Sequence, residues 1–393
     1  MNRKPSPRRR LAFILLAGLL AVAAMAALSQ RERPQGLARV QGLAAAADVA
    51  GFARASGPAP LHFPADYGPH DDYQTEWWYY TGNLETADGR HFGYQFTLFR
   101  RAVLPPAQRV MRASNWAAEQ IYMGHFALTD VAGGRFRAFE RFARGAAGLA
   151  GARAEPYQVW LEDWQVAAVP GRPGITRVQA RADDVAIDLT LTDAKGPVLQ
   201  GDRGYSQKGP DPGNASYYYS LTRLISEGQV TVGGSTYAVA GLSWKDHEYS
   251  TSALAANQVG WDWFALQLDD GSEVKVFQLR RDDGSVDPFS AGSVVDPQGN
   301  VTRLSHGDFQ IEVLDAWRSP RTQAEYPSRW RLTIPSLGLQ LELEPWLADQ
   351  ELNVSYAYWE GAVRVSGASG GQAVAGNGYV ELTGYAGSMQ GQF

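Results

Sequence analysis

The 393-residue sequence contains no cysteine. Disulfide bonds, a thiol nucleophile and a lipid anchor on cysteine are therefore excluded. Nucleotide-binding motifs are absent as well, since the sequence has no phosphate-binding loop and no dinucleotide fingerprint. The nucleophile elbow of α/β-hydrolases is also missing. We therefore expect no cofactor.

Histidine is scarce, and its arrangement argues against a metal centre. The run Asp246-His247-Glu248 would spread its side chains over two faces of a strand. No two histidines stand at the spacing of metal ligands, so we expect no metal site. The six histidines are His62, His70, His91, His125, His247 and His306.

Helical patterning is also missing, because no segment after residue 57 shows a convincing apolar stripe of ten or more residues. Aromatic and β-branched residues instead alternate with polar ones, and DG, GG, PG and GN turns separate these segments. The sequence predicts a mainly β protein whose strands are spaced as in a barrel or sandwich.

The first 28 residues differ from the rest of the chain. A basic start, MNRKPSPRRR, precedes the apolar run of residues 11–28, and Ala24 and Ala26 suit an A-x-A cleavage site. The pattern predicts an export signal and hence a periplasmic or secreted protein. The alternative is an uncleaved anchor in the inner membrane, because residues 11–28 are just long enough to span a bilayer.

The predicted mature chain has more acidic than basic residues. Residues 1–28 contain five of the 36 Lys and Arg residues and none of the 41 Asp and Glu, so removing them leaves 31 against 41, a net charge of −10. An acidic surface argues against nucleic acid or anionic lipid as a partner. Contact with a membrane is then expected only through an uncleaved N-terminal segment.

Two related β domains are predicted along the chain. Residues 29–57 indicate a linker, 58–235 an N-terminal domain and 236–393 a C-terminal domain. Support comes from a weak internal repeat, because residues 77–101 and 261–284 each contain closely spaced tryptophans, an Asp-Gly turn and a strand that ends in arginine.

Aromatic residues are abundant, with 12 Trp, 18 Tyr and 15 Phe, and they cluster at 73–80. On a strand, Glu76, Trp78 and Tyr80 share one face, while Trp77 and Tyr79 share the other. Such a segment is either a core strand or one wall of a pocket for a large apolar molecule. Alternation alone leaves both open.

The segment GLSWKDHEYS (241–250) is the most polar part of an otherwise apolar strand. Trp244, Asp246 and Glu248 share one face, with the carboxylates roughly 6.6 Å apart. Two carboxylates so close, beside a tryptophan, can push one pKa upward, as a general acid requires. The alternative is an ordinary surface strand.

Five segments together resemble the AttH-like, lipocalin-like family of secreted bacterial proteins, which is related to the carotenoid 1,2-hydratases. The resemblance extends from about residue 60 to residue 387 and implies two consecutive lipocalin-like antiparallel β-barrel domains. The segments are YQTEWWYYTGNL (73–84), GYSQKGPDPGNASYYYSLTRL (204–224), GLSWKDHEYS (241–250), WDWFALQLDDGSEVKVFQLRRDDG (261–284) and GNGYVELTGY (376–385).

The resemblance also implies a chemistry. The related hydratases protonate an isoprenoid double bond without a cofactor and capture water on the resulting cation. Asp246-His247-x-Tyr249 matches the family's Asp-His-x-aromatic motif, which implies Asp246 as proton donor and His247 as its orienting partner. These hydratases use a further acid on a following strand, but residues 275–279 contain none, so Glu76 is the candidate second acid.

Two functions are therefore expected. The first is an exported protein that binds a hydrophobic, lipid or isoprenoid-like ligand, shows hydratase-type chemistry and passes the ligand to a membrane transport system. The alternative is a cofactor-independent hydro-lyase or isomerase. Convergence of Asp246 and Glu76 on one cavity would favour the enzyme. A salt bridge from Asp246 to Lys245 or to an arginine would favour the binding protein. The expected ligand-binding residues are Trp78, Tyr80, Trp244, Glu248, Tyr249, Trp261 and Trp263.

Overall fold

The computed structural model describes residues 49–109, 114, 118–251 and 254–390. The predicted export signal (1–28) and the predicted linker as far as residue 48 lie outside the described residues. Within the described part of the chain, none of the helices is long and apolar enough to cross a membrane.

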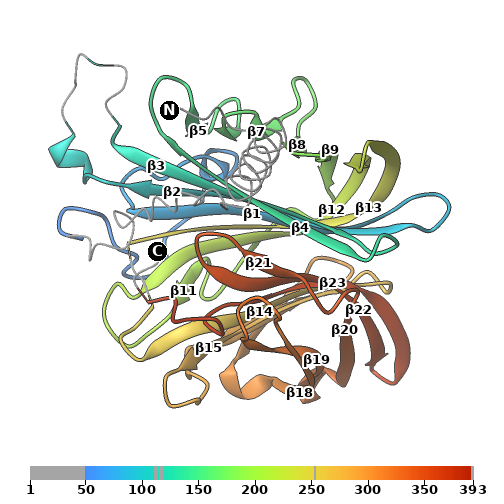
Figure 1. The fold of residues 1–393 in the computed structure, drawn as a ribbon. Helices are drawn as coiled ribbons and strands as arrows, with labels where there is room; N and C mark the ends of the chain where they lie inside the picture. Colours follow the sequence, from blue (N-terminus) through green and yellow to red (C-terminus); the bar gives the residue numbers. More distant parts are fainter. Residues whose placement is uncertain (1–48, 110–113, 115–117, 252–253, 391–393) are drawn as a thin grey trace, which may run out of the picture. The chain divides into compact units, whose positions relative to one another are not determined.

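Thirteen strands form the first sheet, and all of its strand pairs are antiparallel (Figure 1). Their order is β4-β3-β2-β1-β13-β12-β9-β8-β7-β6-β5, with β10 and β11 paired to β12. The strands are β1 (Thr75–Glu85), β2 (His91–Ala102), β3 (Gln120–Asp130), β4 (Arg135–Arg144), β5 (Ala150–Arg153), β6 (Gln158–Leu161), β7 (Trp164–Ala168), β8 (Ile175–Ala182), β9 (Val185–Asp193), β10 (Pro197–Leu199), β11 (Tyr205–Gln207), β12 (Ala215–Val232) and β13 (Ser235–Ser250).

Ten strands form the second sheet, again antiparallel, in the order β17-β16-β15-β14-β23-β22-β20-β19-β18, with β21 paired to β22. They are β14 (Gln258–Leu268), β15 (Glu273–Arg281), β16 (Ala291–Val295), β17 (Val301–Ser305), β18 (Gln310–Arg318), β19 (Glu325–Ile334), β20 (Leu339–Pro345), β21 (Glu351–Asn353), β22 (Ala357–Ser369) and β23 (Gln372–Leu382). The described helices are single 3₁₀ turns: η1 (Ala65–Tyr67), η2 (Pro106–Gln108), η3 (His306–Asp308) and η4 (Pro335–Leu337).

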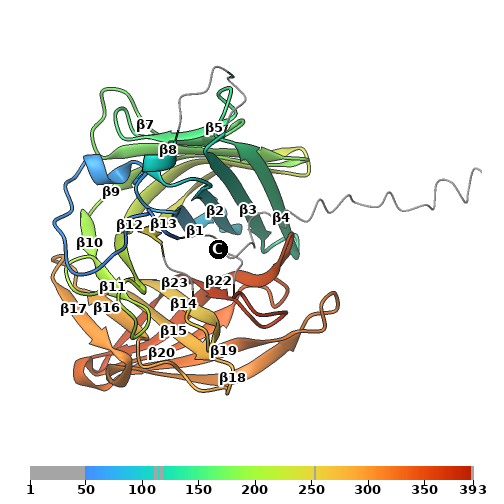
Figure 2. The same cartoon turned by 90° about the vertical axis from the view of Figure 1, so that its left-hand side faces the viewer.

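Each sheet curls around its own apolar core, as Figure 2 shows. Trp78, Tyr80 and Trp164 lie in the first core, and Trp330 and Trp359 in the second. The alternation of apolar and polar residues places one face of each strand inside its sheet, where burial of large rings is the main stabilising term. The predicted architecture, mainly β with two consecutive barrel-like halves, is confirmed.

The chain passes from the first sheet to the second between Ser250 and Gln258. Strand β13 pairs with β1 and β12 along its length, so it belongs to the first sheet. The boundary predicted at residues 235/236 is therefore too early by one strand. Gly233 and Gly234, just before the predicted boundary, form the turn between β12 and β13.

The two halves of the internal repeat occupy equivalent places. Strands β1 and β2 form a hairpin in the first sheet, and β14 and β15 form one in the second. The last long strand of each half returns to pair with its first strand, β13 with β1 and β23 with β14.

The two sheets pack against each other through a third apolar cluster, which contains Tyr79 and Trp244 from the first sheet and Trp263 and Tyr379 from the second. The sheets lie close together at Gly93, where an added Cβ atom would lie 2.4 Å from the Cβ of Ala362. Glycine is required there because any side chain would push the sheets apart.

Candidate active site between the two sheets

Strands β1 and β13 present a different set of side chains on each face. Tyr79 lies opposite Asp246, and Trp77 lies opposite Glu248. Cross-strand partners share a face, so these four side chains point the same way. That face is turned toward the second sheet, because Tyr79 packs against Trp263 with ring centroids 5.1 Å apart.

A cavity of about 140 Å³ lies on this face, between the sheets. Aromatic rings form most of its wall, and the carboxyl groups of Asp246, Glu248 and Glu381 and the ammonium of Lys208 also line it. A closed cavity of this volume holds a molecule of roughly the size of benzene, so it is far too small to enclose a long carotenoid. The lining rings are Trp77, Tyr79, Phe99, Tyr218, Trp261, Trp263, Phe277 and Tyr358.

Asp246 is held rigidly at the wall of the cavity. Its carboxyl group accepts hydrogen bonds from the Tyr218 hydroxyl (2.5 Å), the Ser220 hydroxyl (2.5 Å) and the Trp244 indole N–H (2.8 Å). Burial raises the pKa of Asp246 above its usual range, while the charge of Lys275 and the three hydrogen bonds oppose that rise.

Glu381 is a second carboxyl group at the cavity, contributed by β23. It accepts a hydrogen bond of 2.7 Å from the indole N–H of Trp261. Burial raises the pKa of Glu381 to about 7, and the hydrogen bond from Trp261 only partly offsets this. A group with this pKa is available as a proton donor near neutral pH.

Glu360 lies directly across from Glu381 in the pairing of β22 with β23. One of its oxygens accepts a hydrogen bond of 3.0 Å from the Tyr79 hydroxyl, and the other is buried without a hydrogen-bond partner among the described residues. Burial, followed by the neighbouring Glu381, raises the pKa of Glu360 well above its usual value. Burial thus favours the protonated form of Glu360, which contacts the cavity-lining Tyr79.

Two lysines lie near one end of the cavity, and Lys208 is the one that lines it. The ammonium of Lys208 lies 3.1 Å from the Glu248 carboxylate, which also accepts a hydrogen bond from Ser216. The side chain of Lys275 is buried, and its ammonium lies 4.3 Å from the ring centroids of both Tyr218 and Phe277. Burial and the charge of Lys208 lower the pKa of Lys275 to about 7.

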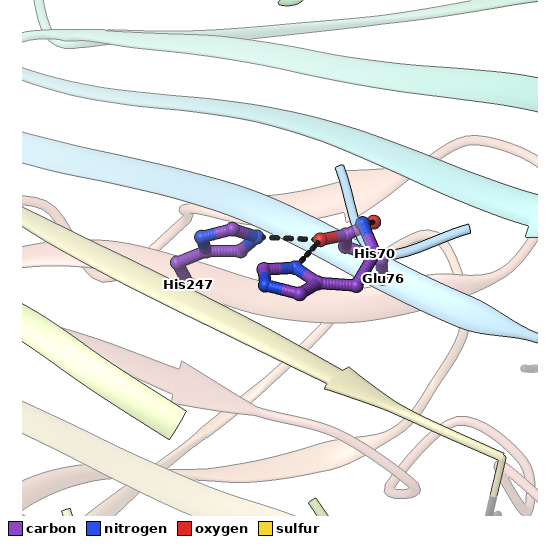
Figure 3. Close-up of side chains that lie close together, drawn as sticks. All are labelled: His70, Glu76 and His247. Atoms are coloured by element: carbon purple, nitrogen blue, oxygen red, sulfur yellow. Dashed lines mark hydrogen bonds and ion pairs between the residues drawn. The ribbon is translucent and has the colours of Figure 1, made fainter. Parts of the chain in front are cut away.

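The opposite face of the same strands carries a separate polar cluster, formed by His70, Glu76 and His247 (Figure 3). One oxygen of Glu76 accepts hydrogen bonds from a ring nitrogen of His70 (2.7 Å) and of His247 (2.8 Å). Its other oxygen accepts a hydrogen bond of 2.9 Å from Arg100. The second ring nitrogen of His70 is hydrogen-bonded to Asp66 at 3.0 Å, and that of His247 is hydrogen-bonded to the Tyr219 hydroxyl at 2.8 Å.

Charges in this cluster balance. Burial opposes ionisation of both His70 and Glu76, but hydrogen bonds to Asp66 and Glu76 raise the pKa of His70 to about 9, and the charge of Arg100 holds the pKa of Glu76 well below its usual value. Burial lowers the pKa of His247 to about 3, so this ring is neutral. Two positive side chains, His70 and Arg100, thus face two negative ones, Asp66 and Glu76.

The same three residues are the described group whose donor atoms lie close enough together, within 4.8 Å, to hold a metal ion. Their contacts suit a hydrogen-bonded network better, because a divalent ion would have to displace the ring protons next to the guanidinium of Arg100. We therefore treat the cluster as a structural element of the first sheet.

The residues predicted as one site are divided between the two faces. Asp246, Glu248, Trp261 and Trp263 line the cavity, and Trp244 supports Asp246. The remaining five lie on the inner face of the first sheet, so the expected pairing of Asp246 with His247 and with Glu76 is corrected: neighbours in a strand point to opposite faces. These five are Glu76, Trp78, Tyr80, His247 and Tyr249.

Aromatic contacts explain why this inner group is core. Trp78 stacks on the His247 ring with centroids 4.9 Å apart, and Tyr249 stacks on His70 at 3.5 Å. The Tyr80 hydroxyl is hydrogen-bonded to that of Tyr157 at 3.0 Å. Among the residues that the structure describes, Asp246 pairs neither with Lys245, which lies on the opposite face, nor with an arginine. The arrangement thus matches neither of the two outcomes expected from the sequence.

Three residues of the candidate site were not predicted. Glu381 lies in the segment 376–385, which carries the family resemblance, and Lys275 lies in a strand that stood out only for lacking an acid. Tyr218 belongs to a run of three tyrosines that is equally compatible with a core strand. Sequence alternation gives their faces but not what covers those faces.

Comparison with known proteins identifies the family of this chain. The AttH-like family model matches residues 54–385, most of the chain. The chain belongs to the AttH-like family. A crystal structure of an AttH protein from Nitrosomonas europaea is 36% identical and covers 85% of this chain and 100% of its own, with a TM-score of 0.75. No curated protein matches the chain.

More distant structures share the architecture of this AttH-like chain. Kievitone hydratase from Nectria haematococca is 15% identical and covers 86% of this chain and 96% of its own, with a TM-score of 0.63. CghA is 12% identical and covers 84% and 95%, with a TM-score of 0.50. At these identities the likeness concerns the fold alone.

Proposed function

We propose that this AttH-like protein binds a small hydrophobic, isoprenoid-like ligand in the cavity between its two sheets and adds water to a double bond of that ligand by acid catalysis. The observation that carries the proposal is a carboxyl group with a pKa of about 7, Glu381, in a cavity walled by aromatic rings. The overall likeness to kievitone hydratase is consistent with this reaction class.

Glu381 is the proposed proton donor. Its proton passes to one carbon of the double bond, the π electrons form the new C–H bond, and the neighbouring carbon becomes a tertiary cation. The faces of Trp261, Trp263 and Phe277 stabilise positive charge in the cavity through cation–π attraction. Such rings also shelter the cation from bulk water.

Asp246 is the proposed acceptor of the second proton. A water molecule forms the C–O bond to the cation, and one of its protons passes to the Asp246 carboxylate. Hydrogen bonds from Tyr218, Ser220 and Trp244 fix this carboxylate in position. Proton exchange with solvent then restores both acids, and the net reaction is addition of H and OH across the double bond.

Incorporation of label tests the reaction. The purified protein is incubated with ten-carbon acyclic isoprenoids in ¹⁸O-labelled water, and the products are analysed by mass spectrometry. We expect incorporation by the wild type and by the control Glu227→Gln, whose side chain is exposed on β12, but not by Glu381→Gln or Asp246→Asn. No incorporation by the wild type, or unchanged incorporation by both cavity variants, would contradict the proposal.

Export and ligand transfer are a further part of the proposed function. They rest on the basic and apolar pattern of residues 1–28. A hydrophobic product released outside the cytoplasm needs a carrier or a membrane transport system to move it through water. Native mass spectrometry of protein isolated from the periplasm tests this, and a co-purifying hydrophobic molecule is the expected result. Recovery of the protein only from the cytoplasm would contradict export.

A further inference from the structure

A tyrosine at the cavity wall has a histidine and a glutamate behind it. The hydroxyl of Tyr358, on β22, is hydrogen-bonded to Nδ1 of His125 at 2.7 Å. Nε2 of the same ring is hydrogen-bonded to a carboxylate oxygen of Glu140 at 3.0 Å. Tyr358 lines the cavity, the side chain of His125 is fully buried, and that of Glu140 is 14% exposed. The three side chains form a line of hydrogen bonds from the cavity to the protein surface.

The strand pairing places His125 on the same face as Asp246. Cross-strand partners share a face, so one row of partners runs from β13 to β4 on the side turned toward the second sheet. The row consists of Asp246, Tyr79, Thr97, His125 and Glu140. In the sheet order His125 is three strands away from Asp246, and Tyr358 reaches it from the second sheet. Asp246 and the Tyr358 hydroxyl therefore meet a ligand at different points of one cavity.

The direction of these hydrogen bonds follows from the charge of Glu140. Burial opposes ionisation of this carboxyl group, but the hydrogen bond with His125 lowers the pKa of Glu140 below its usual value. The hydroxyl of Ser355 donates to its second oxygen at 2.5 Å. A carboxylate only accepts hydrogen bonds, so Nε2 of His125 carries the ring proton, and Nδ1 of the neutral ring accepts from the Tyr358 hydroxyl. The lone pairs of the phenol oxygen are then available to accept a proton.

Tyr358 keeps its own proton unless a neighbouring base takes it. Burial, followed by the neighbouring Glu360, raises the pKa of Tyr358 well above its usual value. A phenol of this kind acts as a base only if its own proton leaves as another arrives. Nδ1 of His125 is placed to receive that proton, and the Glu140 carboxylate stabilises the imidazolium that results. A nucleophile, a base and an orienting carboxylate have the same relation in a catalytic triad.

We propose that Tyr358 is a second catalytic group of the cavity, a general base that removes a proton from a carbon atom of the ligand, with His125 and Glu140 as its positioning residues. This inference rests on the proposed function and adds a second activity, migration of the double bond. The base acts on the tertiary cation that Glu381 generates, in competition with the attack of water.

The step is a proton transfer along the line of hydrogen bonds. A C–H bond next to the cationic carbon breaks, and its electron pair forms a new C=C bond. The proton passes to the oxygen of Tyr358, whose own proton passes to Nδ1 of His125. The imidazolium is then paired with the Glu140 carboxylate. Proton exchange with solvent, through the partly exposed Glu140, restores His125 and Glu381, and the net reaction is isomerisation of the alkene.

Citronellol tests this activity, because it has a single trisubstituted double bond on a ten-carbon chain. In deuterated water the wild type should form the tertiary alcohol by hydration and, as a second product, the isopropenyl isomer. Mass spectrometry and NMR should locate deuterium in the isomer at the carbon that Glu381 protonates. In Tyr358→Phe, which keeps the ring, the yield of the isomer relative to the alcohol should fall about a hundredfold, the usual contribution of a general base.

Tyr326→Phe is the matched control. Tyr326 is also a buried tyrosine of the second sheet, and its hydroxyl donates a hydrogen bond of 3.0 Å to the carboxylate of Glu351. It lies in the second core rather than at the cavity. The control variant should keep the wild-type ratio of isomer to alcohol. Circular dichroism of both variants verifies that each is folded.

The ring of His125 gives a readout that a purely structural contact would not move. Long-range ¹H–¹⁵N correlation spectra of histidine-labelled protein report the tautomer at about pH 8, where an ordinary imidazole is neutral. We expect the Nε2–H tautomer in the wild type. In Glu140→Gln the side-chain amide can donate to Nε2, so the ring should change to the Nδ1–H tautomer. Formation of the isomer should then be lost while hydration remains.

Each failure has a separate signature. Hydration without the isomer in the wild type, or an unchanged ratio of products in Tyr358→Phe, would overturn the inference and leave the proposed function in place. Absence of both products would overturn the proposed function together with the inference. A wild-type ring protonated at Nδ1 would make His125 the donor to Tyr358 and would also overturn the inference.

Discussion

The two faces of strands β1 and β13 carry buried polar groups of opposite character. On the inner face, both oxygens of Glu76 and all ring nitrogens of His70 and His247 have hydrogen-bond partners, and the charges balance, although Nη1 of Arg100 has no hydrogen-bond partner among the described residues. On the outer face, at the cavity, burial raises the pKa of Asp246 and of Glu381 from the second sheet, and one oxygen of Glu360 lacks a partner among the described residues. Nearly complete pairing with balanced charge is typical of a structural network, while acids with raised pKa values beside a cavity are typical of a functional site.

Removal of charge from the inner face should have the largest effect. Glu76→Gln leaves Arg100 and protonated His70 without their shared carboxylate, so we expect a loss of about 3 to 5 kcal/mol in the free energy of unfolding. Denaturant titration measures this, with Glu227→Gln as a surface control of nearly unchanged stability. A Glu76→Gln protein as stable as the wild type would show that the network is not structural.

The same substitution on the outer face should spare the fold and reduce catalysis. Glu381→Gln replaces an acid that is already about half neutral near pH 7, so the stability of the protein should change little. Hydration should fall by about a hundredfold or more, which is the usual contribution of a general acid. Steady-state rates with a ten-carbon isoprenoid measure this loss. A large fall in stability with normal activity of the folded fraction would reverse the assignment of the two faces.

His70 predicts a pH dependence of stability. Its pKa is about 9 in the folded protein and close to 6.5 in the unfolded chain, so its contribution is fully present below about pH 6.5 and is lost as the pH rises through 9. The free energy of unfolding should fall on the order of 2 kcal/mol across this interval. His70→Gln should flatten this part of the profile. An unchanged slope in the variant would contradict the ion pairing.

Trp261→Phe should have the smallest effect of these substitutions, a shift in the pH dependence of hydration. Its indole hydrogen bond lowers the pKa of Glu381, so its loss should raise that pKa by about one unit, the worth of one hydrogen bond to a charged group. The pH at which hydration declines should move upward accordingly. A downward shift in the pH–rate profile would show that Glu381 is not the titrating donor.

The sequence predicts more of the fold than of the site. Alternation separated Trp78 from Tyr79 and Asp246 from His247, and that separation is what the structure shows. It could not tell which face is enclosed by the first sheet and which meets the second, because that depends on how the sheets curl and pack. The ten predicted residues were therefore assigned to one site although they occupy two.

Glu381 and Lys275 could not be assigned to the site from the sequence for the same reason. Trp261 and Glu381 are 120 residues apart and meet only because β14 pairs with β23. Lys275 and Lys208 contact the same ring, Phe277, but come from different sheets, so their proximity depends on the docking of the two sheets. The family segments contain all four of these residues, but only the strand pairing and the packing of the sheets bring them together.

Infrared titration of the protonated carboxyl bands tests the central contrast most directly. Spectra are recorded from about pH 5 to about pH 9 for the wild type, Glu381→Gln and Glu76→Gln. We predict a protonated carboxyl band with a midpoint near pH 7 that is missing in Glu381→Gln and present in folded Glu76→Gln. A transition near pH 7 that persists in Glu381→Gln, or one that disappears only in Glu76→Gln, would assign the titrating acid to another residue and contradict the account.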